Sequence, residues 1–441
     1  MTRDYFFDLV ADLKEVLGSS YVFTASFSGE SSDFVRFNNA LVRQAGTVNQ
    51  GTVQVDVIKG MRHTLVALSL GGNLDDDKKA LHALVNEAKA NLEYFEDDPF
   101  LLYSTDVKDS LDVVDARLPP AAEIVSTIVE ATRGLQFVGI HAQGLTHRGF
   151  ANSFGQRNFV TRETFNTDFS IYLSADKAVK ANVAGKTWKT DAFMQELEKS
   201  KKMLSLLSRP AKTLAKGNYR AFLSPTAVGE ICSMLSWGGF SEKQGRTKQS
   251  PLMQLRTSER SLHPSVHLFE NTASGTGTPF ESGGYLRPAK VELIKEGRWA
   301  NGLVSPRTAK EYGIDTNGAN GNESPESIEI GAGSLAGEDI LSSLGTGVLI
   351  NNLWYLNFSD RTKCQLTGMT RFATFWVENG EILAPMNVMR FDDSIYRLFG
   401  SNLEALTKDR QFMLDQSTYE ERSTGSMHLP GALVKEIAFT L

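Results

Sequence analysis

Side chains that bind metals or act as nucleophiles are sparse in this chain, which has 7 histidines and 2 cysteines. His263 and His267 are four residues apart, and on a helix this spacing would turn both imidazoles toward one zinc ion. Pro264 opposes a helix between them, and on a strand residues four apart lie about 13 Å from each other. The pattern therefore favours two histidines satisfied by their surroundings over a pair of metal ligands.

The other histidines and the two cysteines suggest no site either. His141 and His147 would share a strand face but lie roughly 20 Å apart. Cys232 falls in an apolar stripe at helical spacing, so we expect a small core residue, and we expect Cys364 to be structural as well. The sequence has no G-x-S-x-G elbow and no glycine-rich phosphate loop between a strand and a helix.

Composition narrows the class of protein. The chain has 441 residues, of which 41% are hydrophobic, enough for a sizeable core and two domains. A net charge of -6 gives no electrostatic footprint for nucleic acid or an anionic membrane. Charged residues interrupt the apolar positions of the first 18 residues, which predicts a helix and not a signal peptide or membrane span. Two cysteines favour a reducing cytoplasm over a disulfide framework.

The elements predict an α+β protein with a boundary near residue 215. Residues 1–215 form an α+β domain, in which helix, antiparallel sheet and helix occur twice, in residues 1–95 and 118–208. Residues 216–441 form a domain that is mainly antiparallel β. The finer predictions are a helix over 6–17, strands over 21–27, 34–43, 47–59 and 61–69, a strand over 219–223 followed by a helix over 225–235, a strand from 299 to 304, a helix over 305–312, and a mobile surface loop over 317–327.

Two phrases resemble the TldD/PmbA (TldE) family. Residues 279–313 contain an F-x-x-G-G turn, an aliphatic strand and a capped helix, and residues 375–386 read F-W-V-E-N-G-E-I-L-A-P-M, similar to that family's I-E-N-G-E-I-x-x-P-V. The asparagine, glutamine and glycine spacing of residues 36–62 agrees with this resemblance. Residues 281–283 depart from the acidic form of the first phrase.

The resemblance also implies where chemistry would lie. TldD-type members are regarded as zinc peptidases, with a helix bearing His-Glu, three residues and a second His, and a cysteine near the C-terminus. If Glu230 matches that glutamate, Gly229 and Met234 occupy the two histidine positions, and Cys364 precedes the E-N-G-E phrase instead of following it. We therefore expect a vacant metal site, no cofactor in this chain, and zinc only in a TldD-type partner.

The resemblance then implies a PmbA/TldE-like subunit, inactive alone, of a cytoplasmic TldD/TldE-type metallopeptidase complex that processes peptides or unfolded segments. The alternatives are a self-associating peptide-binding or regulatory protein similar to DNA gyrase modulators, and an enzyme with an unrecognised site. We expect a dimer with a TldD-type homologue or with itself, and no nucleic-acid or membrane partner. Residues 353–358 are either interface or core strand, and the basic segment 241–260 is either a solvated loop or a flexible peptide guide.

Overall fold

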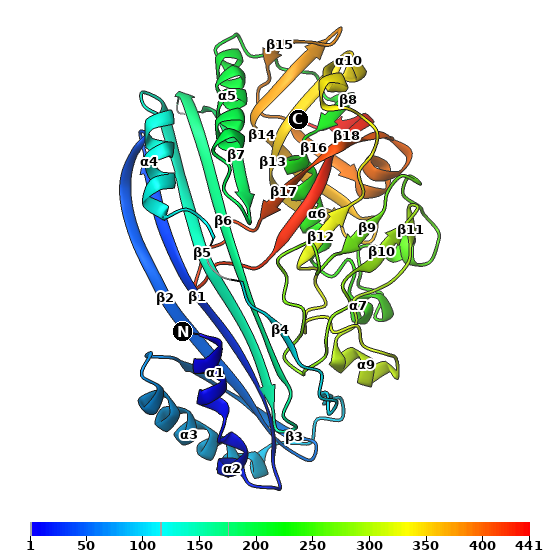
Figure 1. The fold of residues 1–441 in the computed structure, drawn as a ribbon. Coiled ribbons are helices and arrows are strands. Elements are labelled where there is room, and N and C mark those ends of the chain that lie inside the picture. The colour runs from blue at the N-terminus through cyan, green and yellow to red at the C-terminus, as the bar shows by residue number, and fades with distance from the viewer. Residues whose placement is uncertain (1, 115–116, 175) are drawn as a thin grey trace.

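A long, curved antiparallel sheet forms the first half of the molecule (Figure 1). The computed structural model describes residues 2–114, 117–174 and 176–441. Within these residues, seven strands form the first sheet in the order β3-β2-β1-β5-β6-β4, and β7 also pairs with β6. The strands are β1 (Val22–Asn38), β2 (Leu41–Lys59), β3 (Arg62–Ser69), β4 (Ser110–Asp112), β5 (Gln136–Asn152), β6 (Arg157–Ser174) and β7 (Lys177–Gly185).

Alternation of side chains gives this sheet one apolar face. Phe23, Phe27 and Phe37 have the same parity on β1, and all three are buried. The prediction of separate strands over 21–27 and 34–43 was wrong, because β1 runs through the polar residues between them. Those residues are held in the sheet by pairing with β2 on one side and β5 on the other, which local composition does not reveal.

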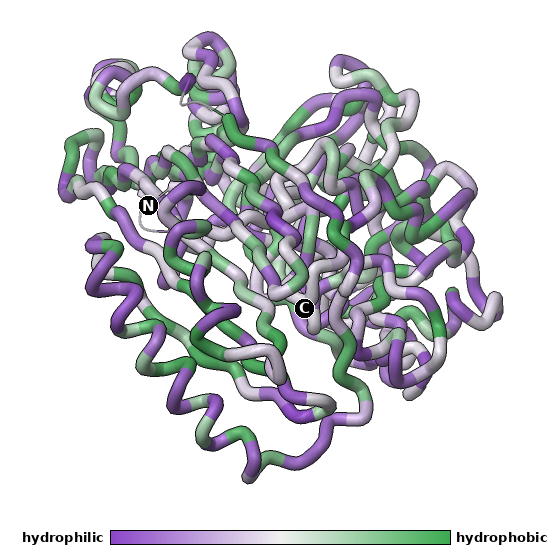
Figure 2. Tube along the Cα trace, turned by 60° about the horizontal axis from the view of Figure 1, so that its bottom comes forward, coloured by the Kyte–Doolittle hydropathy of each residue, from purple (hydrophilic) through white to green (hydrophobic). Residues whose placement is uncertain are grey.

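Five helices cover that apolar face in two groups. Near one end of the sheet are α1 (Arg3–Val10), α2 (Leu13–Leu17) and α3 (Leu74–Asn91), and near the other end are α4 (Ala121–Ala131) and α5 (Thr190–Leu207) (Figure 1). Figure 2 shows that hydrophobic residues of the helices face inward while hydrophilic residues lie outside. The predicted single helix over 6–17 is two helices, because Asp12 starts a new one and binds His82 of α3 at 3.0 Å.

The first sheet has an internal symmetry. Residues 3–91 contain two short helices, three strands and a helix, and residues 121–207 follow the same order with the single helix α4 in place of α1 and α2. The strands lie in the order β3-β2-β1-β5-β6-β7, with β1 and β5 paired at the centre. On either side of this central pair, β2 corresponds to β6 and β3 to β7. This arrangement is the one expected if two copies of one unit join through their first strands.

The second sheet includes a closed ring of strands. Within the described residues it has eleven strands in the order β11-β10-β9-β12-β18-β16-β14-β13-β8, with β15 on β14, β17 on β18, and a β18–β8 pairing that closes the ring. Its pairings are mostly antiparallel, with β8–β13 and β12–β18 parallel. The strands are β8 (Gly217–Leu223), β9 (Leu268–Glu270), β10 (Val291–Lys295), β11 (Arg298–Trp299), β12 (Ser327–Ile330), β13 (Gly347–Asp360), β14 (Gln365–Glu378), β15 (Glu381–Pro385), β16 (Arg390–Ser394), β17 (Leu403–Leu414) and β18 (Ser426–Phe439).

Short helices complete this half. They are α6 (Pro225–Leu235), α7 (Glu242–Arg246), α8 (Met253–Arg256), α9 (Pro306–Tyr312) and α10 (Ile340–Leu344), with the short turn η2 (Gly337–Asp339) and the π-helical η3 (Arg397–Ser401). A further short turn, η1 (Leu92–Tyr94), follows α3 in the first half. The predicted strand over 219–223 and the helices over 225–235 and 305–312 are confirmed, whereas the predicted strand over 299–304 shrinks to the two residues of β11. No helix among the described residues is long and apolar enough to cross a membrane.

Two segments predicted as surface loops are folded into this half. Within residues 317–327, Glu323 is buried and its carboxylate accepts hydrogen bonds from the backbone N–H groups of Lys243 and Ser305, each at 2.9 Å. Within residues 241–260, the buried Glu242 pairs with Arg246 at 2.7 Å. Residues 317–326 form a loop, as predicted, but the loop is not wholly at the surface, because the buried Glu323 carboxylate binds backbone N–H groups. The solvated loop predicted for residues 241–260 is wrong, since they contain α7, α8 and the buried Glu242, and their alternative role as a flexible peptide guide stays a prediction.

A strap joins the two halves. The strap is the connection between β17 and β18, residues 415–425, which reaches the face of the first sheet opposite its helices. Arg422 donates to Ser32 Oγ at 2.9 Å and to the carbonyl of Gly144 at 2.8 Å. Glycine is required at position 144, since its φ is +136° and a Cβ there would lie 2.1 Å from the carbonyl oxygen of Ser31.

Candidate functional site

Helix α6 carries the three positions at which the resemblance predicts a vacant metal site. Ser224 caps the helix by accepting a hydrogen bond from Ala227 N at 3.2 Å, and Pro225 occupies its first turn. Its apolar stripe, which includes Cys232, is buried against the second sheet, as predicted for that cysteine. The opposite face, formed by Thr226, Gly229, Glu230 and Ser233, lines a cleft.

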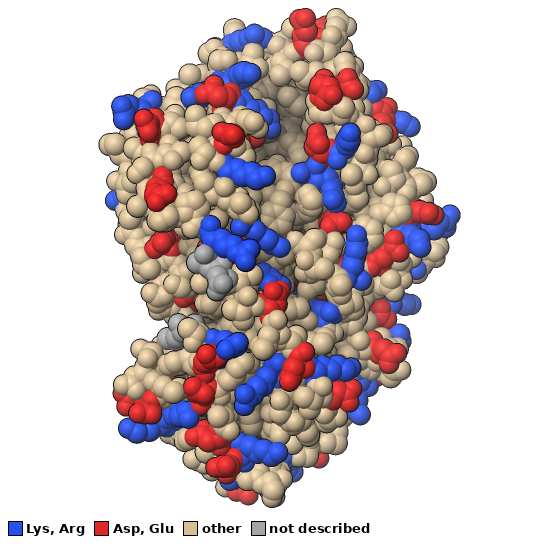
Figure 3. Space-filling model, in the orientation of Figure 1, with Lys and Arg blue, Asp and Glu red and all other residues tan. Residues whose placement is uncertain are grey.

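The cleft lies between the two halves of the molecule and has a volume of about 550 Å³. Lys180 and Asn182 of β7 form one wall, and α6 forms another. Met413 of β17 and Met427 of β18 face each other in register and line the cleft beside Gly229. Figure 3 shows the molecular surface hollowed between the two halves, with Lys and Arg along its borders.

The residues at the predicted vacant positions do not form a zinc-binding set. Gly229 has no side chain, and a Cβ built there would lie 3.2 Å from Met413 Cε. Met234 does not face the cleft, since it is packed in the apolar core with 3% of its surface exposed. No group of three or more His, Cys, Asp or Glu side chains within the described residues could hold a metal ion. Glu230 therefore has no imidazole or thiolate beside it to complete a zinc site.

Glu230 is the carboxyl group of α6 that faces the cleft. Burial raises its pKa to about 8, although hydrogen bonds from Leu353 N and the Asn352 side chain and the charge of Lys180 act in the opposite direction. At neutral pH the side chain is therefore largely a neutral acid. In that state it can donate one hydrogen bond into the cleft as well as accept others.

The wall on β7 offers one fixed cation and an unsatisfied acceptor. Lys180 Nζ lies 3.5 Å from Asp168 Oδ2 and donates to Gln416 Oε1 of the strap at 3.1 Å. The Asn182 side chain donates to Asn166, but its buried Oδ1 accepts no hydrogen bond from any described residue. A buried acceptor without a donor is costly, and because Asn182 Oδ1 is closed off from solvent, a ligand N–H reaches it only if this side chain moves.

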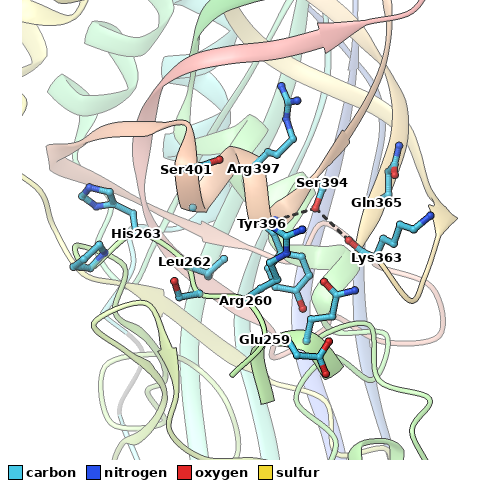
Figure 4. A pocket seen from close by; sticks show the side chains of 14 residues that line it. Glu259, Arg260, Leu262, His263, Lys363, Gln365, Ser394, Tyr396, Arg397 and Ser401 are labelled. Carbon is cyan, nitrogen blue, oxygen red and sulfur yellow. Dashed lines mark hydrogen bonds between the residues drawn. The ribbon is translucent and has the colours of Figure 1, made fainter. Parts of the chain in front are cut away.

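A second, larger hollow of about 790 Å³ lies around η3 (Figure 4). Ser394 Oγ donates to the carbonyl of Lys363 at 3.2 Å and accepts from Tyr396 N at 3.1 Å. The lining is rich in cations, but Lys363 pairs with Asp360 and Arg397 with Asp393, both at 3.0 Å. We take the smaller cleft as the candidate site, because it contains α6 and an unsatisfied acceptor.

The structure does not bring the histidines together. His263 contacts Ser265 at 2.8 Å, whereas His267 stacks on Phe269. His141 and His147 are buried in β5, where each ring contacts a threonine of β6. Both cysteines are buried, as predicted.

Several cleft residues were missed from the sequence. Lys180, Asn182, Met413 and Met427 lie on strands far from α6 in the chain, and no spacing pattern connects them to it. Residues 353–358, predicted to be either an interface or a core strand, differ in burial. Leu353 is buried, whereas Trp354 and Tyr355 are 47% and 76% exposed. Their role in an interface stays a prediction.

Solved structures share this two-sheet α+β fold. TldE from Thermococcus kodakarensis aligns with a TM-score of 0.78 at 14% identity, over 99% of this chain and 100% of that chain. A protein of Thermotoga maritima described as a candidate modulator of DNA gyrase aligns with a TM-score of 0.76 at 14% identity, over 99% of both chains. A protein of Bacteroides thetaiotaomicron with the same description aligns with a TM-score of 0.75 at 14% identity, over 100% of both chains. These alignments define the class of fold.

The sequence comparisons define the family. The family model of the PmbA/TldA metallopeptidase C-terminal domain matches residues 216–441. The Metalloprotease PmbA of Escherichia coli O157:H7 is 33% identical over 125 residues, a match that spans 28% of this chain and 25% of that protein. The chain belongs to the TldD/PmbA (TldE) family, as the two sequence phrases predicted.

Proposed function

We propose that this chain is a PmbA/TldE-like subunit without zinc of its own, which works in a cytoplasmic complex with a zinc-bearing TldD-type homologue to process peptides or unfolded segments. The observation that carries this proposal is the composition of α6, where Gly229 and Met234 stand at the positions of the expected histidine ligands and Met234 faces the core. In this complex the partner supplies the metal, and this chain supplies part of the surface that holds the substrate.

The lining of the cleft supports a peptide as ligand. The neutral Glu230 can donate to a backbone carbonyl, and Asn182 Oδ1 can accept a backbone N–H once its side chain turns toward the cleft. Met413 and Met427 give an apolar surface that adapts to side chains of different shape. Backbone recognition next to an adaptable surface suits a ligand of variable sequence.

The test is purification of the tagged chain from its native host under mild conditions, followed by identification of the accompanying proteins. We expect a homologue with the His-Glu and second-His helix, zinc in stoichiometric amount only when that homologue is present, and peptidase activity only in the complex. The isolated chain serves as the control. One tightly bound zinc per isolated chain, lost on His263→Ala or His267→Ala substitution, would contradict the proposal.

A second candidate is a self-associating peptide-binding or regulatory protein without a peptidase partner. Residues 41–50 of β2 pair with β1 but with no strand on their outer side among the described residues, and this open edge favours the second candidate because it allows self-association. If the purified chain brings down no zinc-bearing homologue yet binds extended peptides, this second function replaces the first.

A further inference from the structure

Two neighbouring side chains of opposite charge in the wall of the hollow around η3 form no ion pair. Glu259 and Arg260 both line this hollow and both are exposed. Within the described residues, the Arg260 guanidinium has no hydrogen-bond partner, and the Glu259 carboxylate accepts a single hydrogen bond, from the Thr257 hydroxyl at 2.9 Å. The two charged groups do not bind each other, although they are adjacent in the chain.

Other charges of this region are paired. Arg246 and Arg256 of the same segment both bind Glu242, at 2.7 Å and 2.6 Å, and the other two cations of the hollow bind aspartates. An exposed ion pair between Glu259 and Arg260 would contribute little to stability. Both groups are therefore free to bind a ligand.

Both charges act at one place in the hollow. Arg260 N donates to the carbonyl of Gln254 at 2.9 Å, which fixes the backbone from which the guanidinium extends. Burial raises the pKa of the Tyr396 hydroxyl, and among the smaller effects Glu259 raises this pKa while Arg260 lowers it. Figure 4 shows both side chains beside Tyr396, so a cation site and an anion site lie next to each other.

We propose that the hollow around η3 binds a small zwitterion, either a free amino acid or a short peptide, with its carboxylate on Arg260 and its ammonium group on Glu259. A guanidinium binds a carboxylate through two parallel N–H···O bonds, and a carboxylate accepts hydrogen bonds from an ammonium group. A ligand with one charge would be repelled by one of the two groups, so the pair selects ligands that have both charges.

The size and position of the hollow agree with a separate site for a small molecule. Its volume of about 790 Å³ is in the usual range for such sites. It shares no lining residue with the candidate cleft, so a zwitterion bound here leaves the cleft open.

Blocked analogues test whether both charges of the ligand are needed. The zwitterionic probes are L-alanine and L-alanyl-L-alanine, while N-acetyl-L-alanine lacks the ammonium group and L-alaninamide lacks the carboxylate. We expect saturable binding of at least one zwitterion in isothermal titration calorimetry. Each blocked analogue should bind about tenfold more weakly or worse, because it loses one charge-assisted interaction. The tighter of the two zwitterions shows whether the site takes an amino acid or a peptide.

Substitutions test whether the ligand lies in this hollow. Arg260→Gln and Glu259→Gln should each weaken binding of the zwitterion about tenfold or more, without a change in melting temperature, because both side chains are exposed. Lys248→Gln is the matched control, because Lys248 is an exposed cation of the same segment that does not line the hollow. This control should bind the zwitterion as tightly as the unsubstituted chain does.

Three results would overturn the proposal. They are no saturable binding of either zwitterion, equal binding of the blocked analogues, and undiminished binding by Arg260→Gln, which would place the ligand elsewhere. These outcomes are independent of whether a zinc-bearing homologue co-purifies.

Discussion

The guanidinium of Arg422 lies 3.7 Å from the carboxylate of Glu30, 392 residues away in the chain, and both side chains are almost fully buried. Burial lowers the pKa of Arg422 to about 10, and the charge of Glu30 opposes this shift. The pair lies where the strap meets the first sheet. It links the second half to β1 of the first sheet.

We expect Arg422→Met to lower the free energy of unfolding by about 3–5 kcal/mol, because it leaves the buried Glu30 carboxylate without a counter-charge. The matched control on the same strap is the contact of Arg148 with Glu421 at 2.8 Å, which is more exposed. Arg148→Met should cost about 1 kcal/mol or less. Denaturant unfolding of the two variants measures both values, and a smaller loss for Arg422→Met than for Arg148→Met would contradict the prediction.

Glu230 predicts a dependence of stability on pH. Its pKa is raised by burial from 4.5 in the reference state to about 8 in the folded chain, so ionisation disfavours the folded state as pH rises between these values. Glu230→Gln removes that cost. We expect the difference in melting temperature between the Glu230→Gln variant and the unsubstituted chain to increase from pH 4.5 to 8 and then to level off. The control is Glu87→Gln on the exposed side of α3, for which this difference should show no such trend.

His63 predicts the opposite trend. Hydrogen bonding to Asp56 raises its pKa above 6.5, with a smaller contribution from Asp98, which also pairs with Arg307 of α9. The stabilising effect is fully present below 6.5 and is lost as pH rises through the higher folded value. In thermal unfolding, the His63→Gln variant should therefore be less stable than the unsubstituted chain at acidic pH and about equally stable at basic pH. The variant His263→Gln is the control for the loss of a histidine, because the His263 ring hydrogen-bonds only with Ser265 among the described residues.

Glu323 should stabilise the loop of residues 317–327 and the segment 241–260 that it binds. Its carboxylate binds two backbone N–H groups and two serine hydroxyls, so we expect Glu323→Ala to cost on the order of 3 kcal/mol. It should also speed proteolysis within residues 241–260. Glu311→Ala, which removes only a partly exposed pair with Lys243, should change neither quantity measurably.

Elements with strong end signals were predicted from the sequence with their bounds. Ser224 and Pro225 start α6, and Ser305 and Pro306 start α9, so capping and proline chemistry fixes both helices without help from distant residues. The apolar alternation of β1 was also evident at its two ends. Its continuity through polar residues 28–33 was not, because it depends on β5, more than 100 residues later in the chain.

The candidate site was predicted less completely than the fold. The resemblance located Gly229 and Glu230, and the structure places both on the cleft. The wall formed by Lys180 and Asn182 follows from the packing of the two halves, which no local pattern encodes. Glu323 was missed because a glutamate among small polar residues is normally solvated, and its burial becomes favourable only when two separate segments bring their N–H groups to it.

The ring of strands in the second sheet has a consequence for biosynthesis. Strand β18 pairs with β8, β12, β16 and β17, all of which leave the ribosome before it. Until β18 is made, β8 has only the neighbour β13, and the ring cannot close. The second half therefore closes after the first, whose strands pair within residues 22–185, and its unclosed intermediate leaves apolar strands without their partners.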